Sequence, residues 1–338
     1  MTEPTHRLTP VIRLAPAKVN LTLAVVGRRP DGYHDLHSVF VPLTLADRLS
    51  LTVSGPPGSN QPDTLHVSGP DTGPLHANLV LMGIAAARAA IGEGPGSPAT
   101  PPLAARLEKY IPVAAGLGGG SSDGAAAFDG ALEAWAAMDH LDPDRRRLAA
   151  ATIGSDVPFF LAGGPALVEG RGERVMPLGG IKGGIDGEPG ILLVTPRVAI
   201  RTPDVFTVFA ATRGKGDGSV RTTSEHLAQE LKTGLSAKDL VARAGVLAAA
   251  NDLLSAAILV EPGLVSVRRA LMRTLGRPVG LSGSGPTLWT LYPSLAAASE
   301  AARTVSAAVA SGTIPSIGDG PPAIIATTIQ SRHEEVLP

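Results

Sequence analysis

One glycine-rich segment of the 338-residue chain has the residue types and the spacing to bind phosphate. It reads PVAAGLGGGSSDGAA from Pro112 to Ala126, with four glycines in five positions and two serines directly after them. Backbone N–H groups at the start of a helix are unpaired and carry partial positive charge, and glycines let an anion approach them closely. The segment therefore predicts a loop around a phosphate chain. Its candidate residues are Pro112, Val113, Ala114, Ala115, Gly116, Leu117, Gly118, Gly119, Gly120, Ser121 and Ser122.

Other glycine motifs fit this segment less well. No Gly-Lys-Ser/Thr follows, as a Walker A loop requires, and Gly116-x-Gly118-x-x-Ser121 lacks the third glycine of a dinucleotide motif. The letters GSSDG from Gly120 to Gly124 match the nucleophile elbow of a hydrolase, but that elbow needs a strand running directly into its serine. A flexible hinge before a helix is a further alternative. Four glycines with two hydroxyls at a helix start favour phosphate over the hinge.

Two charged residues outside the loop lie in unusual sequence settings. Asp156 is an acid among apolar neighbours in IGSDVPFF, and the local sequence alone favours a helix cap there, because Ser155 and Asp156 are typical N-cap residues. Lys18 shares a predicted strand face with Asn20, and lysine is rare in this chain, which has six. The ordinary alternative to a functional role for Lys18 is a place on a solvent-exposed strand face.

The elements that must position these residues begin with a strand. Residues 17–26 alternate between apolar and polar types, which predicts a half-buried strand, and 38–53 contains further strand-like runs. The letters NLVLMGIAAARAAIG predict a helix capped by Asn78 and ending near Gly92. Segments rich in Gly, Pro and Ser predict loops at 55–76 and 92–102.

The second half of the chain predicts mostly helices. Residues 122–138 carry apolar side chains at helical spacing, and the Gly-rich stretch 179–190 is the best candidate for a domain boundary. Further elements are expected as a strand at 191–196, helices near 237–247, 251–259 and 263–275, a strand-loop-strand at 278–292, a helix near 295–310 and a strand near 323–329. Strands and helices mix throughout, which indicates a two-layer α+β or α/β fold.

Composition bounds the class of protein. The length suggests about two domains, and 29 basic against 30 acidic residues give no sign of a nucleic-acid partner. No apolar run of about 18 residues predicts a membrane helix, and the N-terminal residues do not resemble a signal peptide. The chain has no cysteine, which fits a cytoplasmic protein. Nothing in the sequence calls for an obligate protein partner.

Several segments together resemble the GHMP kinases, the relatives of galactokinase, homoserine kinase, mevalonate kinase and phosphomevalonate kinase. They are PAKVNLTL, the glycine-rich segment, and GLSGSGPTLWTLY at 280–292. Two longer stretches, AKVNLTLAVVGRRPDGYHDLHSVF and IGSDVPFFLAGGPALVEGRGE, are similar to one branch of the family, whose alcohol substrate carries a cytidine diphosphate group. The resemblance runs from about residue 14 to 292.

The resemblance implies a fold and a reaction. The fold is α+β and two-domain, with a ribosomal-protein-S5-like N-terminal domain, expected at 1–185, and a ferredoxin-like C-terminal domain, expected at 186–338. The reaction is phosphoryl transfer from ATP, with Mg²⁺, to a small-molecule alcohol. The resemblance makes Asp156 the general base, Lys18 the cation that orients it and the acceptor hydroxyl, and Asn20 a contact of the acceptor.

The resemblance also implies a cytidine pocket. It places Tyr33, His34 and Phe206 around the base, where two aromatic faces can sandwich a pyrimidine and a histidine can hydrogen-bond its edge. Turn packing, a surface histidine and a core phenylalanine are the ordinary alternatives. Further acceptor contacts are expected from Thr202, Pro203, Gly283 and Ser284. A kinase of the same family acting on homoserine or a mevalonate derivative would not need this pocket. A non-catalytic sensor should have lost Lys18 or Asp156.

Overall fold

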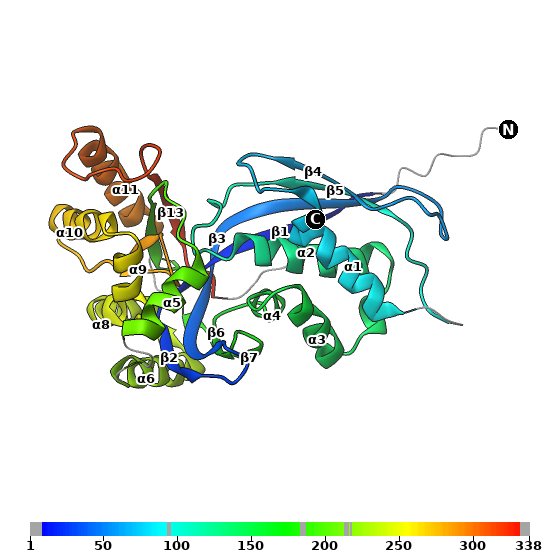
Figure 1. The fold of residues 1–338 in the computed structure, drawn as a ribbon, viewed down its shortest axis with the longest axis horizontal. Helices are drawn as coiled ribbons and strands as arrows, with labels where there is room; N and C mark the ends of the chain where they lie inside the picture. The colour runs from blue at the N-terminus through cyan, green and yellow to red at the C-terminus, as the bar shows by residue number, and fades with distance from the viewer. Residues whose placement is uncertain (1–8, 93–95, 183–186, 213–215, 217, 332–338) are drawn as a thin grey trace. The chain divides into compact units, whose positions relative to one another are not determined.

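The computed structural model describes residues 9–92, 96–182, 187–212, 216 and 218–331 (Figure 1). Internal contacts divide the chain into two compact units. The first unit comprises residues up to Pro16, Ala46–Val113 and Gly119–Leu161; the second comprises Ala17–Leu45, Ala114–Gly118 and the chain from Ala162 onward. The domain boundary expected between residues 185 and 186 lies outside the described residues and stays a prediction.

The described residues of the first unit form strands and four α-helices. It holds the start of β1 (Val11–Asn20), the second part of β3 (His34–Val53), β4 (Thr64–Ser68), the short helix η1 (Leu75–Ala77), α1 (Leu79–Ile91), β5 (Leu103–Glu108), α2 (Gly119–Ala134), η2 (Met138–His140), α3 (Pro143–Ile153) and α4 (Val157–Leu161). Strand β5 pairs with β4 in parallel and with residues 48–53 of β3 in antiparallel register. Leu49, Leu51, Leu103 and Leu107 of this sheet are buried.

Helices α1 and α2 approach each other closely at two glycines. A Cβ atom on Gly83 would overlap the carbonyl oxygen of Gly124, so a side chain at Gly83 would force the two helices apart. The predicted cap of α1 is confirmed, because Asn78 Oδ1 accepts a hydrogen bond from the Val80 N–H at 3.0 Å. The helix ends at Gly92, as expected. This packing fixes α2, whose first turn carries part of the glycine-rich segment.

The second unit holds the remaining elements. They are β2 (Ala24–Arg28), the first part of β3, β6 (Ala166–Gly170), β7 (Arg174–Pro177), β8 (Ile181–Lys182), β9 (Gly190–Thr195), α5 (Thr202–Thr212), α6 (Ser219–Thr233), β10 (Leu235–Ser236), α7 (Ala237–Ala242), α8 (Ala244–Ala249), α9 (Leu254–Val260), α10 (Gly263–Leu275), β11 (Gly280–Leu281), β12 (Leu288–Tyr292), α11 (Leu295–Ala310) and β13 (Ala323–Thr328). Strands β11, β12, β9 and β13 form an antiparallel four-stranded sheet in that order. Residues of α5, α9, α10 and α11 join it in one apolar core.

The sequence misplaced several elements. The helix expected at 122–138 begins at Gly119 and ends at Ala134, so two of the loop glycines belong to its first turn. The loop expected at 55–76 contains β4, because residues 64–68 pair with residues 104–108 of β5. The strand expected at 17–26 is interrupted after Asn20, and both of its faces are buried. Within the part of the chain that the structure describes, no helix is long and apolar enough to cross a membrane.

Candidate active site

Lys18 and Asn20 form a buried polar pair at the end of β1. Lys18 Nζ donates a hydrogen bond to Asn20 Oδ1 at 2.8 Å, and Asn20 Nδ2 donates to Ser38 Oγ at 3.0 Å. Lys18 Nζ also lies 4.6 Å from the ring centroid of Phe40. Lys18 is only 5% exposed and Asn20 only 3%, so the alternative of a solvent-exposed strand face is wrong. Burying an ammonium costs solvation free energy, which favours a functional role for this lysine.

The C-terminal glycine motif lies against this pair. Gly283 has φ of 58°, and a Cβ atom there would lie 3.3 Å from Asn20 Oδ1 and 3.8 Å from Lys18 Nζ. Ser284 is buried, and its hydroxyl lies 2.9 Å from Thr202 Oγ1 at the start of α5. The structure therefore brings Lys18, Asn20, Gly283, Ser284 and Thr202 into one neighbourhood of the second unit.

Gly116 lies so close to the backbone of the C-terminal glycine motif that no side chain fits there, which the sequence did not predict. Its φ is 75°, and a Cβ atom would lie 2.6 Å from the Ser282 carbonyl oxygen and 2.9 Å from that of Gly285. Ser282 Oγ in turn donates a hydrogen bond to the Gly116 carbonyl at 2.9 Å. Close approach of protein backbone thus requires glycine at this position, independently of the predicted phosphate.

Asn251 orients the C-terminal glycine motif, a role that no local sequence signal indicates. Its Nδ2 donates to the carbonyls of Leu281 at 3.0 Å and Gly283 at 2.8 Å, while its Oδ1 accepts from the Leu253 N–H at 2.9 Å. Asp252 accepts a hydrogen bond from the Val25 N–H at 2.9 Å. Asn251 thus holds the glycine motif in place through partners 30 and 32 residues away in the sequence.

The structure stacks two of the three predicted cytidine-pocket residues on each other. The rings of His34 and Phe206 lie 5.0 Å apart at an interplanar angle of 22°. His34 Nε2 is buried and has no hydrogen-bond partner in the described part of the protein. Burial, aided by the charge of Arg28, lowers the pKa of His34, so its imidazole is neutral at pH 7. Tyr33 is 56% exposed, and the Arg171 guanidinium lies 5.0 Å from its ring centroid.

The first unit carries the rest of the glycine-rich segment. Because α2 begins at Gly119, the N–H groups of its first turn have no partners within the helix. Ser122 Oγ in this turn is buried and has no hydrogen-bond partner among the described residues, whereas Ser121 is half-buried. This buried hydroxyl, beside N–H groups that have no partner within the helix, has the chemistry to hold a phosphate oxygen.

Asp156 lies in the turn directly before α4, also in the first unit. Its side chain is half-buried, and the Val157 N–H at the start of α4 donates to the Gly154 carbonyl at 3.2 Å. A position directly before a helix is that of an N-cap, so the cap alternative stays open beside the catalytic one. The role of Asp156 stays a prediction.

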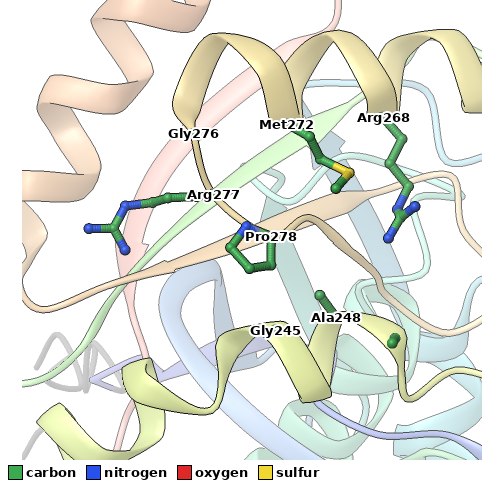
Figure 2. A pocket seen from close by; sticks show the side chains of 8 residues that line it. Gly245, Ala248, Arg268, Met272, Gly276, Arg277 and Pro278 are labelled. Carbon is green, nitrogen blue, oxygen red and sulfur yellow. The ribbon is translucent and has the colours of Figure 1, made fainter.

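A cavity of about 390 Å³ lies elsewhere in the second unit, between α8, α10 and the turn that follows α10. In Figure 2 the Arg268 side chain points toward α8, whereas the Arg277 side chain points away from it. Arg268 Nε donates to the Val279 carbonyl at 2.8 Å. None of the residues that line this cavity is a predicted site residue.

Comparison with known proteins first defines the class. Residues 78–164, which include the glycine-rich segment and Asp156, match the GHMP kinases N terminal domain. The predicted GHMP kinase fold is confirmed by solved structures. A homoserine kinase from Cytophaga hutchinsonii, only 17% identical and thus similar in fold alone, covers 98% of each chain with a TM-score of 0.67.

Closer relatives define the particular branch. The 4-diphosphocytidyl-2-C-methyl-D-erythritol kinase of Pelotomaculum thermopropionicum is 36% identical, covering 88% of this chain and 93% of its own. The enzyme of that name from Deinococcus radiodurans is 35% identical, and the match covers 89% of this chain and 91% of that enzyme. A crystal structure of 4-(cytidine 5'-diphospho)-2C-methyl-D-erythritol kinase is 31% identical in sequence. The match covers 94% of this chain and 99% of the solved chain, with a TM-score of 0.65. The chain therefore belongs to the 4-diphosphocytidyl-2-C-methyl-D-erythritol kinase family, a branch of the GHMP kinases.

Proposed function

We propose that the protein transfers the γ-phosphoryl group of ATP to the 2-hydroxyl of 4-diphosphocytidyl-2-C-methyl-D-erythritol, a step of the non-mevalonate isoprenoid precursor pathway. The observation that carries the choice of substrate is the stacked His34–Phe206 pair with its buried, unpartnered ring nitrogen. A neutral imidazole can donate or accept one hydrogen bond at that nitrogen, depending on its tautomer. Homoserine and mevalonate derivatives carry no base that would use it.

The cytidine end of the acceptor would be bound by aromatic and polar groups of the second unit. His34 Nε2 would hydrogen-bond the edge of the base, and Phe206 and the exposed ring of Tyr33 would supply stacking faces. Thr202 and Pro203 at the exposed start of α5, with Gly283 and Ser284, would contact the remainder of the acceptor. Asn20, held by Lys18 and Ser38, would fix the acceptor near the reacting hydroxyl.

ATP would be bound through its phosphates by the segment from Pro112 to Ser122. The free N–H groups of the first turn of α2 and the Ser122 hydroxyl support this assignment. We propose that Mg²⁺ enters with ATP as part of the substrate. This ion keeps several waters and binds chiefly through substrate phosphates in sites of this kind, so no protein ligand is assigned to it.

The reaction itself needs positioning, charge neutralisation and a proton acceptor. The 2-oxygen of the acceptor forms a bond to the γ-phosphorus while the bond from that phosphorus to the β–γ bridging oxygen breaks, and ADP leaves with the electron pair. Asp156 takes the proton of the hydroxyl, and Lys18 keeps the acceptor hydroxyl oriented.

A coupled ADP-release assay with three acceptors side by side tests the choice of substrate. The cytidine-linked alcohol should be turned over, whereas homoserine and mevalonate should give rates near the ATP-only background. Preferential turnover of homoserine or mevalonate would exclude the proposed substrate. ATP binding without turnover of any acceptor would favour a sensor that keeps the nucleotide fold.

We further propose two domains with their boundary near residues 185 and 186, a cytoplasmic location and no obligate protein partner. The absence of cysteine supports a reducing compartment.

A further inference from the structure

Three charged side chains form a buried cluster in the first unit that the proposed reaction does not use. Lys109 Nζ lies between the carboxylates of Asp47 and Asp123, donating to Asp47 Oδ2 and, at 2.7 Å, to Asp123 Oδ2. Asp47 is fully buried, Asp123 is 2% exposed and Lys109 is 7% exposed. Buried charges of this kind persist only where they are paired, and the cluster holds one cation against two acids.

The cluster lies on both sides of the candidate phosphate-binding residues, which run from Pro112 to Ser122. Asp47 Oδ1 accepts the N–H groups of Tyr110 at 2.5 Å and Ile111 at 2.9 Å, directly before the segment begins. Asp123 directly follows Ser122, in the second turn of α2. A Cβ atom on Gly119, the first residue of α2, would lie 3.3 Å from Lys109 Nζ. The charges therefore lie directly against the turn to which we assign the phosphates of ATP.

One carboxyl oxygen of the cluster lacks the partner that an anion needs. Asp123 Oδ1 is buried and has no hydrogen bond within the described ranges. Burial, and then the charge of Asp47, raises the pKa of Asp123 to about 7, against the opposing effect of Lys109. Lys109 and Asp47 are the two charged groups that act on it. A proton on Oδ1 would leave the contact of Oδ2 with Lys109 intact and would make the cluster neutral.

We propose that Asp123 takes up one proton from solvent when ATP binds, so that this cluster couples nucleotide affinity to pH. Asp123 lies four residues after Gly119, about 6 Å along the helix axis. Phosphate charge placed at the first turn of α2 would repel an ionised Asp123 and favour its protonated form. By linkage, ATP must then bind more weakly as the pH rises above 7, where the free protein has lost this proton. The inference rests on the proposed binding of ATP at this turn.

Titration calorimetry of MgATP into the intact protein, in three buffers of different ionisation enthalpy, measures the proton directly. At pH 7.5 the parent should take up on the order of half a proton per ATP, and its Kd should rise by about threefold to tenfold per pH unit between pH 7 and 8.5. Asp123→Asn keeps an oxygen for Lys109 but cannot ionise. It should take up no proton beyond that of the nucleotide itself and should hold a nearly constant Kd. Asp129→Asn, a later acid of the same helix, is the matched control and should behave as the parent.

Equal heats in all three buffers for the parent protein would overturn the proposal without any variant. So would a pH dependence of Kd that Asp123→Asn leaves unchanged. A complete absence of ATP binding would instead contradict the proposed function, and the two failures are therefore distinguishable.

Discussion

Asp156 is the residue on which the proposed chemistry most depends. Asp156→Asn keeps the shape of the side chain and still caps a helix, since Asn is about as good an N-cap as Asp, but it removes the charge that accepts the hydroxyl proton. Turnover should fall by about 10²–10⁴-fold, with both KM values and thermal stability little changed. Asp142→Asn is the matched control, because Asp142 caps α3 through the Arg145 N–H. If Asp156 only caps α4, both variants should retain nearly full steady-state turnover.

Lys18 should act together with Asp156. Lys18→Met should lower turnover, and the double variant with Asp156→Asn should lose less than the sum of the two free-energy losses, because residues that act as a unit are not additive. Steady-state kinetics of the four proteins measures the coupling. Strictly additive losses would show that the two residues contribute independently.

Phe206 is the residue that we expect to contribute most to specificity for cytidine. Phe206→Ala removes a stacking face and should raise KM for the cytidine-linked acceptor through a loss of about 1–3 kcal/mol, while KM for ATP stays constant. Thr207→Ala, which alters an exposed neighbour on α5, is the control and should change neither constant. An unchanged acceptor KM in the Phe206 variant would assign Phe206 to core packing.

At the scale of elements, the crossing of α1 and α2 positions the turn that we propose to bind phosphate. Gly83→Ala would drive a methyl group into the Gly124 carbonyl and should destabilise the protein by about 1–3 kcal/mol, the usual cost of overpacking. Gly245→Ala in α8 meets no atom closer than 3.9 Å and should be neutral or slightly stabilising. Urea unfolding compares the two, and equal stabilities would show that the helix crossing tolerates a side chain.

The elements that could be predicted carry their signals locally. The α1 cap at Asn78 and the helices α10 and α11 follow from residues within one or two turns. Strands β4 and β5 could not be predicted in the same way, because their stability comes from pairing with each other and with β3. For the same reason, the role of Asn251 and the Asp47–Lys109–Asp123 cluster emerge only from contacts between distant residues.

At the scale of the whole molecule, Asp123 should make stability depend on pH. Its pKa in the folded protein, about 7, exceeds the ordinary 3.8 of an unfolded chain. The neutral acid therefore favours folding; this contribution is complete below pH 4 and is lost as pH rises through 7. Between pH 5 and 8, the stability of Asp123→Asn should rise relative to the parent by on the order of 2 kcal/mol. Urea unfolding at pH 5 and pH 8 measures this difference. An equal stability difference between variant and parent at both pH values would argue that Asp123 is ionised throughout.

The identity of the product tests the central claim most directly. The purified protein should be incubated with MgATP and 4-diphosphocytidyl-2-C-methyl-D-erythritol, and the mixture followed by ³¹P NMR. We expect one new phosphomonoester resonance, from a phosphate bonded to the 2-oxygen of the acceptor. It should grow in step with ADP while the diphosphate bridge of the acceptor stays intact. A phosphomonoester at another hydroxyl, or ADP formed with inorganic phosphate alone, would contradict the proposed function.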